Sequence, residues 1–463
     1  MGKISACEAA ICFLVYNYGE TVSRQIVVKQ DDMSRVLIVG SGGREHAIAW
    51  SIRNTAGESV EIFCAPGNGG ISQVTQIVDV PTDDSAGLAA FAESQRIDVT
   101  FVGPEAPLAS GIVDLFTARR LRIVGPVAAA AQLEASKIFA KDFMARHKVP
   151  TAAYRVAASA DEAQKQLTSG AFGPADSPVV IKADGLAAGK GVVVAANHAE
   201  AEKAIQELMV HHIAGREAGQ RVVLEEALQG TEASLLVFAD GRDYALMPPA
   251  RDHKRVGEND TGPNTGGMGS ITDPSVLAKN VQDRVVREIV EPTLAGARED
   301  GFTFKGILFL GLMLTNDGPK LLEYNVRFGD PETQAILIRL KTDLLSVFEA
   351  IYNQTLGNLR VEWTEGSSAC VVAANKGYPG KYEKGAIIEG LEEVDPDSVQ
   401  VFHAGTSKDA NGRFIATGGR VLGVTAAADS LSSALGLCYE SLAKIHWPGI
   451  QFRRDIGRAA AIS

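Results

Sequence analysis

The sequence predicts an α/β protein whose folded part opens with a doubly wound parallel sheet. Short apolar, β-branched runs such as residues 35–40 (RVLIVG) alternate with segments of helical spacing up to about residue 125, as in βαβ units. Glycine-rich loops follow these runs directly, at the strand ends where open α/β sheets bind ligands. The loops GSGGRE, APGNGG, GPEAP and VGP are therefore expected to surround one binding site.

Four segments are expected along the chain. Residues 1–33 precede the first strand pattern and are predicted to lie outside the fold, whereas residues 34–136 form a substrate-binding α/β domain. Helix, strand and hairpin patterns predict a second domain over residues 137–360, with a flexible lid subdomain at about residues 151–225. Short strands, glycine turns and a helix predict a small C-terminal α/β domain over residues 361–463.

Composition and charge exclude several classes of function. Hydrophobic residues make up 46% and charged residues 22% of the 463 residues, a mixture that excludes wholesale disorder. The formal charge of −11 provides no positive field for nonspecific binding of nucleic acid. The apolar run at residues 9–16 is too short to span a bilayer, so no membrane partner is expected. The five scattered cysteines form no C-x-x-C pair and are expected to be reduced thiols in the cytoplasm.

The first glycine loop, GSGGRE at residues 40–45, favours a phosphorylated small molecule over a dinucleotide. Exposed amides at the start of a helix attract an anion. However, Glu45 stands at the third glycine position of the dinucleotide fingerprint, and the second strand ends in Ala-Pro-Gly rather than in an acidic residue that holds a ribose. Glycines needed only for a tight strand–helix turn are the alternative explanation.

A second glycine loop, residues 185–191 (GLAAGKG), is not a Walker A motif. Its first two glycines are separated by three residues rather than four, and no Ser or Thr follows Lys190. The loop lies inside a predicted hairpin just after Lys182, so it can fold over a triphosphate while its amides and the lysine offset the charge. A flexible hairpin tip without a ligand is the alternative.

A weaker signal comes from the strand end at residues 224–228 (LEEAL). Backbone groups near Glu226 and Leu228 can bond the edge of an adenine ring, and Glu232 can accept hydrogen bonds from ribose hydroxyls. Two glutamates at a strand end, taken alone, are more often solvated than functional.

The segment at residues 321–327 (LLEYNVR) predicts a metal–phosphate site. Side chains alternate along a strand, so Glu323, Asn325 and Arg327 are expected on one face and Leu322, Tyr324 and Val326 on the other. A carboxylate and an amide oxygen can hold a hard cation, and an arginine can neutralise a phosphoryl group or hold a carboxylate. Asp330 and Glu332 are expected to orient these groups, and a solvated edge strand is the alternative.

A polar, glycine-dense segment, RDHKR at residues 251–255 followed by DTGPNTGGMG at residues 260–269, predicts an ordered loop that holds polar substrates close to the backbone. His253 alone would more often be structural, but within this segment it is expected to line the site.

These motifs together resemble those of the ATP-grasp ligases, and within them the phosphoribosylamine–glycine ligases. The motifs that carry the resemblance are GSGGREHAIAW, APGN, VGPEAPL, SKIFAKDFMARHKVPTA, VIKADGLAAGKGV, DHKRVGENDTGPNTGGMG, LEYNVRFGDPETQ and HAGT. The resemblance implies an N-terminal pre-ATP-grasp domain, an ATP-grasp domain with a lid, and formation of glycinamide ribonucleotide from glycine, 5-phosphoribosylamine and ATP. It also implies a glycyl phosphate intermediate and a place in purine biosynthesis, and the protein is expected to be a monomer, with a dimer left open.

The resemblance further assigns roles to individual residues. Mg²⁺ or Mn²⁺ would be held by Glu323 and Asn325, and the catalytic groups would be Arg327, Lys182 and His253. ATP would be bound by Lys137, Lys182, Gly185, Gly189, Gly191, Glu226, Leu228 and Glu232. The substrates would be bound by Gly42, Gly43, Arg44, Glu45, Pro104, Glu105, Asp252, Asn264, Thr265, Gly266, Gly267, Met268, Gly269 and Arg327.

Two departures from the family pattern are visible. Arg251 stands where Gln is expected before Asp-His-Lys, and the strand predicted at residues 306–314 offers no second acidic metal ligand. The rival interpretations are an ATP-grasp ligase for another acid or amine, a nicotinamide-dependent oxidoreductase, and a nucleotide sensor without turnover.

Overall fold

The computed structural model describes residues 33–187 and 191–458. The helices and strands described below all lie in the unit that begins at Ser34. The predicted extension over residues 1–33 therefore falls, apart from Met33, outside the described residues, as does Gly189 of the second glycine loop. Within the described ranges, the helices are too short or too polar to cross a membrane.

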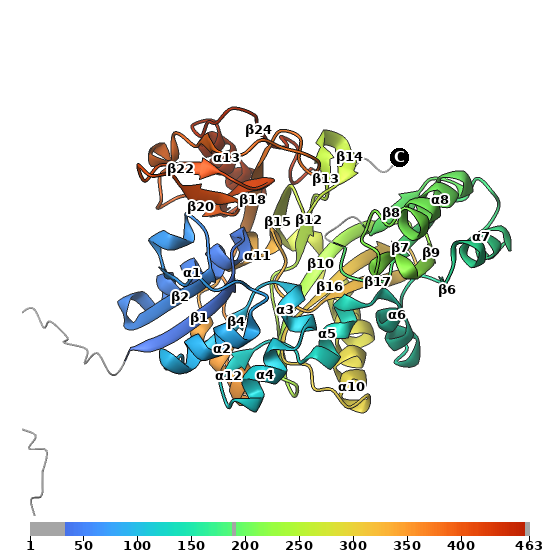
Figure 1. Ribbon diagram of the computed structural model, residues 1–463, viewed down its shortest axis with the longest axis horizontal. Helices are drawn as coiled ribbons and strands as arrows, with labels where there is room; N and C mark the ends of the chain where they lie inside the picture. The colour runs from blue at the N-terminus through green and yellow to red at the C-terminus, as the bar shows by residue number, and fades with distance from the viewer. Residues whose placement is uncertain (1–32, 188–190, 459–463) are drawn as a thin grey trace, which may run out of the picture. The chain divides into compact units, whose positions relative to one another are not determined.

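The N-terminal part confirms the predicted doubly wound sheet (Figure 1). Its five strands pair in parallel in the order β3-β2-β1-β4-β5. Leu37 and Val39 of β1 pack into one core, and Val36 and Ile38 pack into another on the opposite face, which explains the uninterrupted apolar run. The elements are β1 (Ser34–Gly40), α1 (Gly43–Ala56), β2 (Val60–Pro66), β3 (Gln76–Ile77), α2 (Ser85–Ser94), β4 (Val99–Val102), α3 (Glu105–Ala109), α4 (Ile112–Ala118), β5 (Ile123–Val124) and α5 (Ala128–Ala135).

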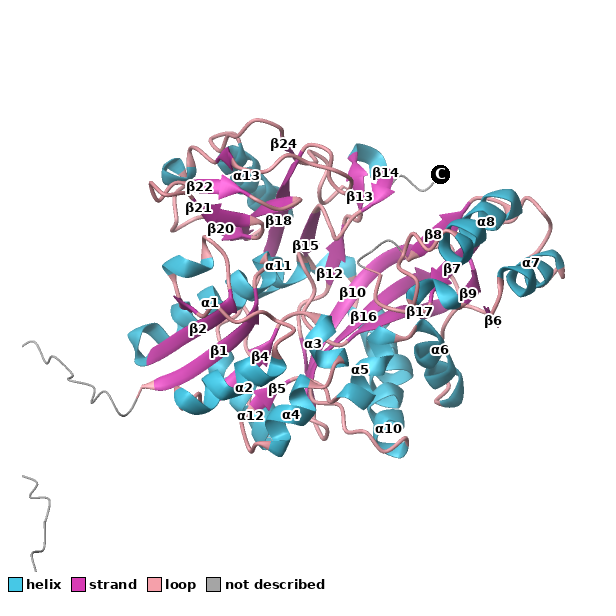
Figure 2. Cartoon of the chain, viewed as in Figure 1, coloured by secondary structure: helices cyan, strands magenta, loops and turns pink. Residues whose placement is uncertain are grey.

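A four-stranded antiparallel sheet in the order β6-β9-β7-β8 lies where the lid subdomain is predicted. The strand–loop–strand hairpin is confirmed, because β7 and β8 pair with Lys182 opposite Val192. Two helices, α7 and α8, lie beside this sheet (Figure 2), and their buried apolar side chains join the same core as those of the sheet. The elements are α6 (Lys137–Arg146), β6 (Tyr154–Ala157), α7 (Ala160–Thr168), β7 (Val179–Ala183), β8 (Val192–Ala195), α8 (His198–Ile205) and β9 (Val222–Glu226).

The largest sheet has ten strands and runs through the rest of the chain. Its main path is β17-β16-β10-β12-β15-β18-β23-β20, with β11 beside β10 and β24 beside β18. The second predicted hairpin is present as β16 and β17. The elements are β10 (Thr231–Ala239), β11 (Tyr244–Leu246), β12 (Ala250–Asp252), β15 (Gly269–Thr272), β16 (Gly306–Thr315), β17 (Gly318–Asn325), β18 (Ser367–Asn375), β20 (Gln400–His403), β23 (Arg420–Ala428) and β24 (Ile450–Gln451).

Most strands of the last hundred residues extend this sheet, while β19, β21 and β22 form a small sheet of their own. Ser270 of β15 pairs with Cys370 of β18, so the sheet crosses the boundary predicted at residue 360 without a break. Two smaller sheets, β13–β14 and β19-β22-β21, lie beside it. The remaining elements are β13 (Arg255–Gly257), β14 (Thr261–Asn264), α9 (Lys279–Val285), α10 (Glu291–Glu299), α11 (Glu332–Leu337), α12 (Leu344–Asn353), β19 (Ala386–Ile387), β21 (Thr406–Lys408), β22 (Phe414–Ala416) and α13 (Leu431–Leu442).

Glu45 explains two of the glycines in the N-terminal loops. Its buried carboxylate accepts hydrogen bonds from the Gly42 amide at 2.6 Å and from Arg44 Nε at 2.6 Å. A Cβ atom at Gly103 would lie 1.9 Å from Glu45 Oε1, and one at Gly40 would lie 2.5 Å from Glu45 Cγ. The glycines therefore make room for this carboxylate between two strand ends, so part of the glycine pattern serves packing.

We expect Gly103→Ala to lower the free energy of unfolding by about 1–3 kcal/mol, because the added methyl group must displace Glu45. Gly436→Ala is the matched control, since its Cβ in helix α13 meets nothing within 4 Å and the change removes a helix glycine, which favours folding by up to about 1 kcal/mol. Thermal unfolding followed by circular dichroism measures both. Equal midpoints for the two variants would contradict this account of Glu45.

Candidate active site

Strand β17 carries the predicted metal ligands, but with one correction to the expected alternation. Its pairing with β16 shifts at Gly311 and Leu312, so Leu312 faces Leu321 while Gly311 faces Glu323. This bulge places Leu321, Tyr324 and Val326 in the same core. The prediction that Leu322 shares that core face was therefore wrong; Leu322 is only half-buried. A single extra residue in one strand cannot be seen in the residue alternation, because it reverses that alternation only from the bulge onward.

Glu323 lies near lysines from three different parts of the chain: helix α6, strand β7 and the loop after β12. Lys137 Nζ at the start of α6 is 3.4 Å from Glu323 Oε2. Burial alone would raise the pKa of Glu323, but Lys137, Lys254 and Lys182 outweigh it and hold the pKa well below the usual range. The carboxylate is therefore charged at neutral pH, and it faces a cluster of cations suited to phosphate oxygens.

Asn325 is the last residue of this strand, and Arg327 follows two residues later. Arg327 Nη2 donates to Asn325 Oδ1 at 3.2 Å and lies 2.8 Å from Glu134 Oε1 in α5. Arg327 Nε lies 3.4 Å from Glu105 Oε2 at the start of α3. Glu105, which is expected to contact a substrate, thus has Arg327 as an ion-pair partner in this structure. Burial alone would raise the pKa of Glu105, but Arg327 and Arg44 hold it below the usual range.

Glu134 was not predicted as a site residue. It is 4% exposed, and its second oxygen accepts a hydrogen bond from the Val326 amide at 2.8 Å. Burial raises its pKa, against the opposing effect of Arg327. A single glutamate in an alanine-rich helix gives no sequence signal of such a contact, because its partner lies far along the chain.

The donor set suits a hard cation only in part. Glu323 and Asn325 offer one carboxylate and one amide oxygen, and residues 33–187 and 191–458 contain no cluster of three His, Cys, Asp or Glu side chains that could hold a metal ion. Mg²⁺ usually keeps several waters and is shared between one or two carboxylates and substrate phosphates. These residues therefore fit a metal that arrives with a nucleotide.

The predicted ATP-binding residues come from the lid sheet and the strands next to it. Lys182 Nζ donates to Glu225 at 3.0 Å and to the Leu322 carbonyl at 3.1 Å. The side chain of Glu226 does not contact Lys182. Its Oε1 accepts a hydrogen bond from the Ala153 amide at 3.0 Å and lies 3.3 Å from Lys320 Nζ. Leu228 and Gly185 are half-buried and Gly191 is buried. Glu232 pairs with Lys254 at 3.1 Å, with both side chains a little under half exposed.

The loop between β12 and β15 folds back on itself through the hairpin β13–β14. Thr265 Oγ1 donates to the Lys254 carbonyl and accepts from the Gly267 amide. Asp252 Oδ1 is buried and has no hydrogen-bond partner among the residues that the structure describes. Burial raises the pKa of Asp252 well above its usual range, and the neighbouring Glu332 raises it further. An unpartnered buried oxygen indicates a place for a donor that the protein does not supply.

His253 lies buried in the same loop, and backbone groups contact both of its ring nitrogens. It is 5% exposed; its Nδ1 lies 3.3 Å from the Gly269 carbonyl, and its Nε2 accepts from the Gly457 amide at 3.1 Å. Burial lowers its pKa, so the ring is neutral with both nitrogens occupied by backbone groups. The ring therefore connects this loop to the C-terminal segment, and the catalytic role expected from the sequence stays a prediction.

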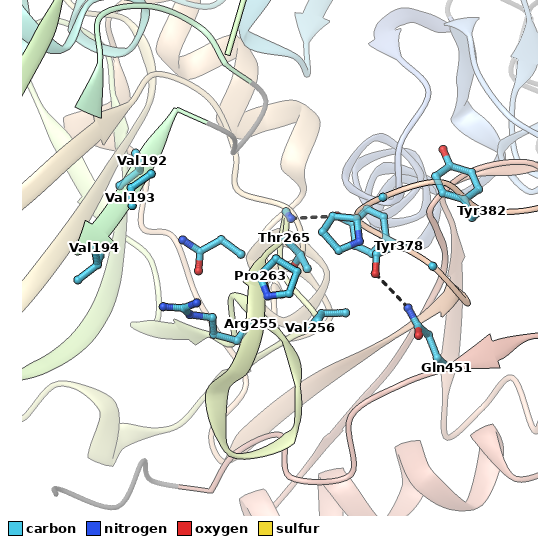
Figure 3. A pocket seen from close by; sticks show the side chains of 15 residues that line it. Val192, Val193, Val194, Arg255, Val256, Pro263, Thr265, Tyr378, Tyr382 and Gln451 are labelled. Atoms are coloured by element: carbon cyan, nitrogen blue, oxygen red, sulfur yellow. Dashed lines mark hydrogen bonds between the residues drawn. The ribbon is translucent and has the colours of Figure 1, made fainter. Parts of the chain in front are cut away.

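Two pockets border these residues. One of about 990 Å³ lies between Val192–Val194 of β8, the hairpin β13–β14 with Asn264 to Gly266, and the loop at residues 377–382 (Figure 3). The Gly266 amide donates to the Tyr378 hydroxyl across its edge at 2.9 Å. The predicted substrate loop therefore faces the lid strand across an open space.

The second pocket, of about 380 Å³, lies against the first glycine loop. It is lined by Ser41 and Gly42, by the loops at residues 67–68 and 404–406, and by Asp330 and Arg420. Arg420 Nη1 donates to the Asp330 carbonyl at 2.7 Å, and its Nη2 lies 3.2 Å from Asp330 Oδ2. Arg420 was not predicted; it brings a cation from the C-terminal part to the N-terminal loops. Arg44 instead donates to the Phe328 carbonyl, and Met268 is fully buried.

Comparison with known proteins identifies the family. Residues 34–134, 135–333 and 368–459 match the N domain, the ATP-grasp (A) domain and the C domain of phosphoribosylglycinamide synthetase. The chain is 47% identical over 426 residues to phosphoribosylamine–glycine ligase of Xanthomonas axonopodis pv. citri, covering 91% of this chain and 97% of that protein. The chain belongs to the phosphoribosylglycinamide synthetase family.

Other relatives agree with this family membership. The Vibrio cholerae phosphoribosylamine–glycine ligase is 46% identical, with 92% of this chain and 98% of that protein covered. The crystal structure of the Thermotoga maritima phosphoribosylamine–glycine ligase superposes with a TM-score of 0.78 at 34% identity, covering 91% of this chain and 99% of that one. A biotin carboxylase from Campylobacter jejuni shares the fold at 15% identity, with a TM-score of 0.69 and coverage of 91% and 93%.

We expect Glu134→Gln to lower the free energy of unfolding by about 3 kcal/mol, because it leaves the buried Arg327 guanidinium with one charged partner fewer. Glu93→Gln is the matched control, since Glu93 pairs with Arg119 at 3.8 Å on the surface and should change the free energy by less than about 0.5 kcal/mol. Urea unfolding compares the two. The interpretation fails if Glu134→Gln is as stable as its surface control.

Proposed function

We propose that this protein joins glycine to 5-phosphoribosylamine, using ATP, to give glycinamide ribonucleotide, ADP and phosphate in purine biosynthesis. The observation that carries the proposal is the charged Glu323, which lies with Asn325 on one strand, close to Lys137 and beside Lys182 and Lys254. This is a donor set for a metal–nucleotide complex, and it occurs in a chain of the phosphoribosylglycinamide synthetase family.

Different residues around strand β17 are assigned to different parts of the nucleotide. We assign the phosphates to Lys137, Lys182 and the loop that contains Gly185, Gly189 and Gly191. We assign the adenine ring to the backbone near Glu226 and Leu228, and the ribose hydroxyls to Glu232. Mg²⁺ or Mn²⁺, held by Glu323 and Asn325, would spread the negative charge of the phosphoryl group as it is transferred.

The reaction then needs two steps. A carboxylate oxygen of glycine attacks the γ-phosphorus of ATP, the bond to the bridging oxygen breaks, and ADP leaves with that electron pair. Arg327 is fixed by Glu134 and Glu105, and we place its remaining donor capacity toward the glycine carboxylate and the γ-phosphoryl group. The amine of phosphoribosylamine then attacks the carbonyl carbon of glycyl phosphate, phosphate leaves, and the nitrogen loses a proton.

The second substrate fits the pocket of about 380 Å³ beside Gly42. The start of α1, with Gly42, Gly43 and Arg44, provides amides for its phosphate group. Asp252, which has an unpartnered buried oxygen, is the group we assign to the substrate amine. We also assign substrate binding to the loop residues Asn264 to Gly269 and to Pro104 and Glu105; of these, Asn264, Thr265 and Gly266 line the larger pocket.

We further propose that the protein acts as a monomer in the cytoplasm, with domains at residues 34–136, 137–360 and 361–463. All groups named above come from one chain, so a partner subunit is not needed to complete the site. The cysteines in the described part, Cys64, Cys370 and Cys438, are buried and free, as expected for a reducing compartment.

The proposal is tested by measuring ADP release with glycine, alanine or bicarbonate as the acid, while phosphoribosylamine is generated in the assay. We expect turnover with glycine that depends on both ATP and phosphoribosylamine. Faster turnover without glycine, or with another acid, would show that the chain is an ATP-grasp ligase of different specificity.

We expect Glu323→Ala to abolish metal-dependent turnover, a loss of at least about a hundredfold, while the fold remains intact by circular dichroism. Glu58→Ala is the control, because the Glu58 side chain is 96% exposed and should leave turnover unchanged. Near-normal activity of Glu323→Ala at saturating Mg²⁺ would show that Glu323 is not a metal ligand.

A further inference from the structure

A buried cluster of three charged side chains lies beside strand β17, and two of them, Lys141 and Glu225, have no role in the proposed reaction. Glu225 of β9 is 1% exposed, Lys141 of α6 is 2% exposed and Lys182 of β7 is 5% exposed. Lys141 Nζ lies 2.9 Å from Glu225 Oε2, and Lys182 Nζ lies 3.0 Å from Glu225 Oε1. One carboxylate is therefore shared by two ammonium groups at a depth where an unbalanced charge is costly.

The cluster joins the lid sheet to strand β17 at the bulge. Lys182 donates to the Leu322 carbonyl at 3.1 Å. Lys141 donates to Thr151 Oγ1 at 2.8 Å, and Thr151 donates in turn to the Leu321 carbonyl at 2.6 Å. Thr151 also bridges to Leu321 as an isolated β pair. The two lysines thus tie Glu225 to the two consecutive carbonyls that precede Glu323.

The three charges of the cluster do not sum to zero, and their net charge determines how strongly the cluster attracts a phosphate. Lys182 alone with Glu225 would be a neutral pair, which attracts phosphate poorly. With Lys141, the cluster carries one net positive charge. Burial lowers the pKa of Lys141 to about 8, with Glu225 opposing that fall, so the amine is protonated at neutral pH.

The helix supplies this cation by its spacing. Lys137 and Lys141 are four residues apart on α6 and so lie on one face. Lys137 faces Glu323 and Lys141 faces Glu225. One helical turn therefore gives one lysine to each of the two acidic side chains around the site.

We propose that Lys141 is a positioning residue for nucleotide binding: it neutralises Glu225, so that the positive charge of Lys182 is available to the phosphates of ATP. Lys141 acts through Glu225 and does not touch the nucleotide itself. The inference rests on the proposed function only in assigning Lys182 to phosphate.

The test measures the affinity of the full-length protein for ADP with Mg²⁺ by isothermal titration calorimetry. We expect Lys141→Met to weaken ADP binding at least about tenfold, which corresponds to about 1.4 kcal/mol, and Lys141→Arg to restore most of it. Arg146→Met is the matched control: it removes the same charge from the same helix, but Arg146 pairs with Asp300 at the surface and should leave ADP affinity unchanged.

A double variant separates charge from mere packing. In Lys141→Met with Glu225→Gln, the net charge of the cluster returns to one positive unit, so we expect ADP affinity within about threefold of wild type. If Lys141 only holds Glu225 in place, the double variant should bind as weakly as Lys141→Met, and this result would overturn the proposal. So would wild-type affinity in Lys141→Met.

Two further outcomes keep the test decisive. If Lys141→Met does not fold, as judged by circular dichroism, Glu225→Gln alone replaces it: its cluster has two positive charges, so ADP affinity should stay equal or rise, and a tenfold loss would refute the charge argument. Failure of the wild-type protein to bind ADP would instead contradict the proposed function, independently of Lys141.

Discussion

A buried guanidinium needs charged partners, and the position of Arg327 depends on its ion pairs with two glutamates. Its contacts with Glu134 of α5 and Glu105 of α3 fix the segment that directly follows strand β17 against these two helices. Breaking such a pair leaves an uncompensated charge in a low-dielectric site. Because Glu323 and Asn325 lie at the end of strand β17, directly before Arg327, the geometry of the proposed metal site depends on these two ion pairs.

Charges of opposite sign are segregated along that strand and the two residues that follow it. Around Glu323 the neighbours are lysines, and they keep its carboxylate charged; around Arg327 the neighbours are glutamates, which raise the pKa of the guanidinium although burial alone would lower it. Groups held in this way need little reorganisation when charge moves between them. The arrangement suits phosphoryl transfer, where positioning and electrostatic stabilisation account for most of the catalysis.

The sequence contained enough information for the hairpins, the parallel sheet and the strand that carries Glu323 and Asn325, because each depends on local alternation or on a glycine loop. It could not reveal the bulge before Glu323, which moved Leu322 off the core face. Glu134, Glu225 and Arg420 were also missed, since each meets a partner that is distant in the chain. The sequence also could not show that the ring of His253 contacts two backbone groups, one of them far along the chain. The site residues themselves stay predictions until ligands are bound.

The most direct test of the central claim follows the oxygen atoms of glycine. Glycine labelled with ¹⁸O in both carboxylate oxygens is incubated with the protein, ATP and phosphoribosylamine generated in the assay, and the products are analysed by mass spectrometry. The account predicts that one ¹⁸O appears in the released phosphate and the other stays in the amide of glycinamide ribonucleotide. Unlabelled phosphate together with singly labelled glycinamide ribonucleotide, so that the second ¹⁸O has left in water, would contradict a reaction through glycyl phosphate.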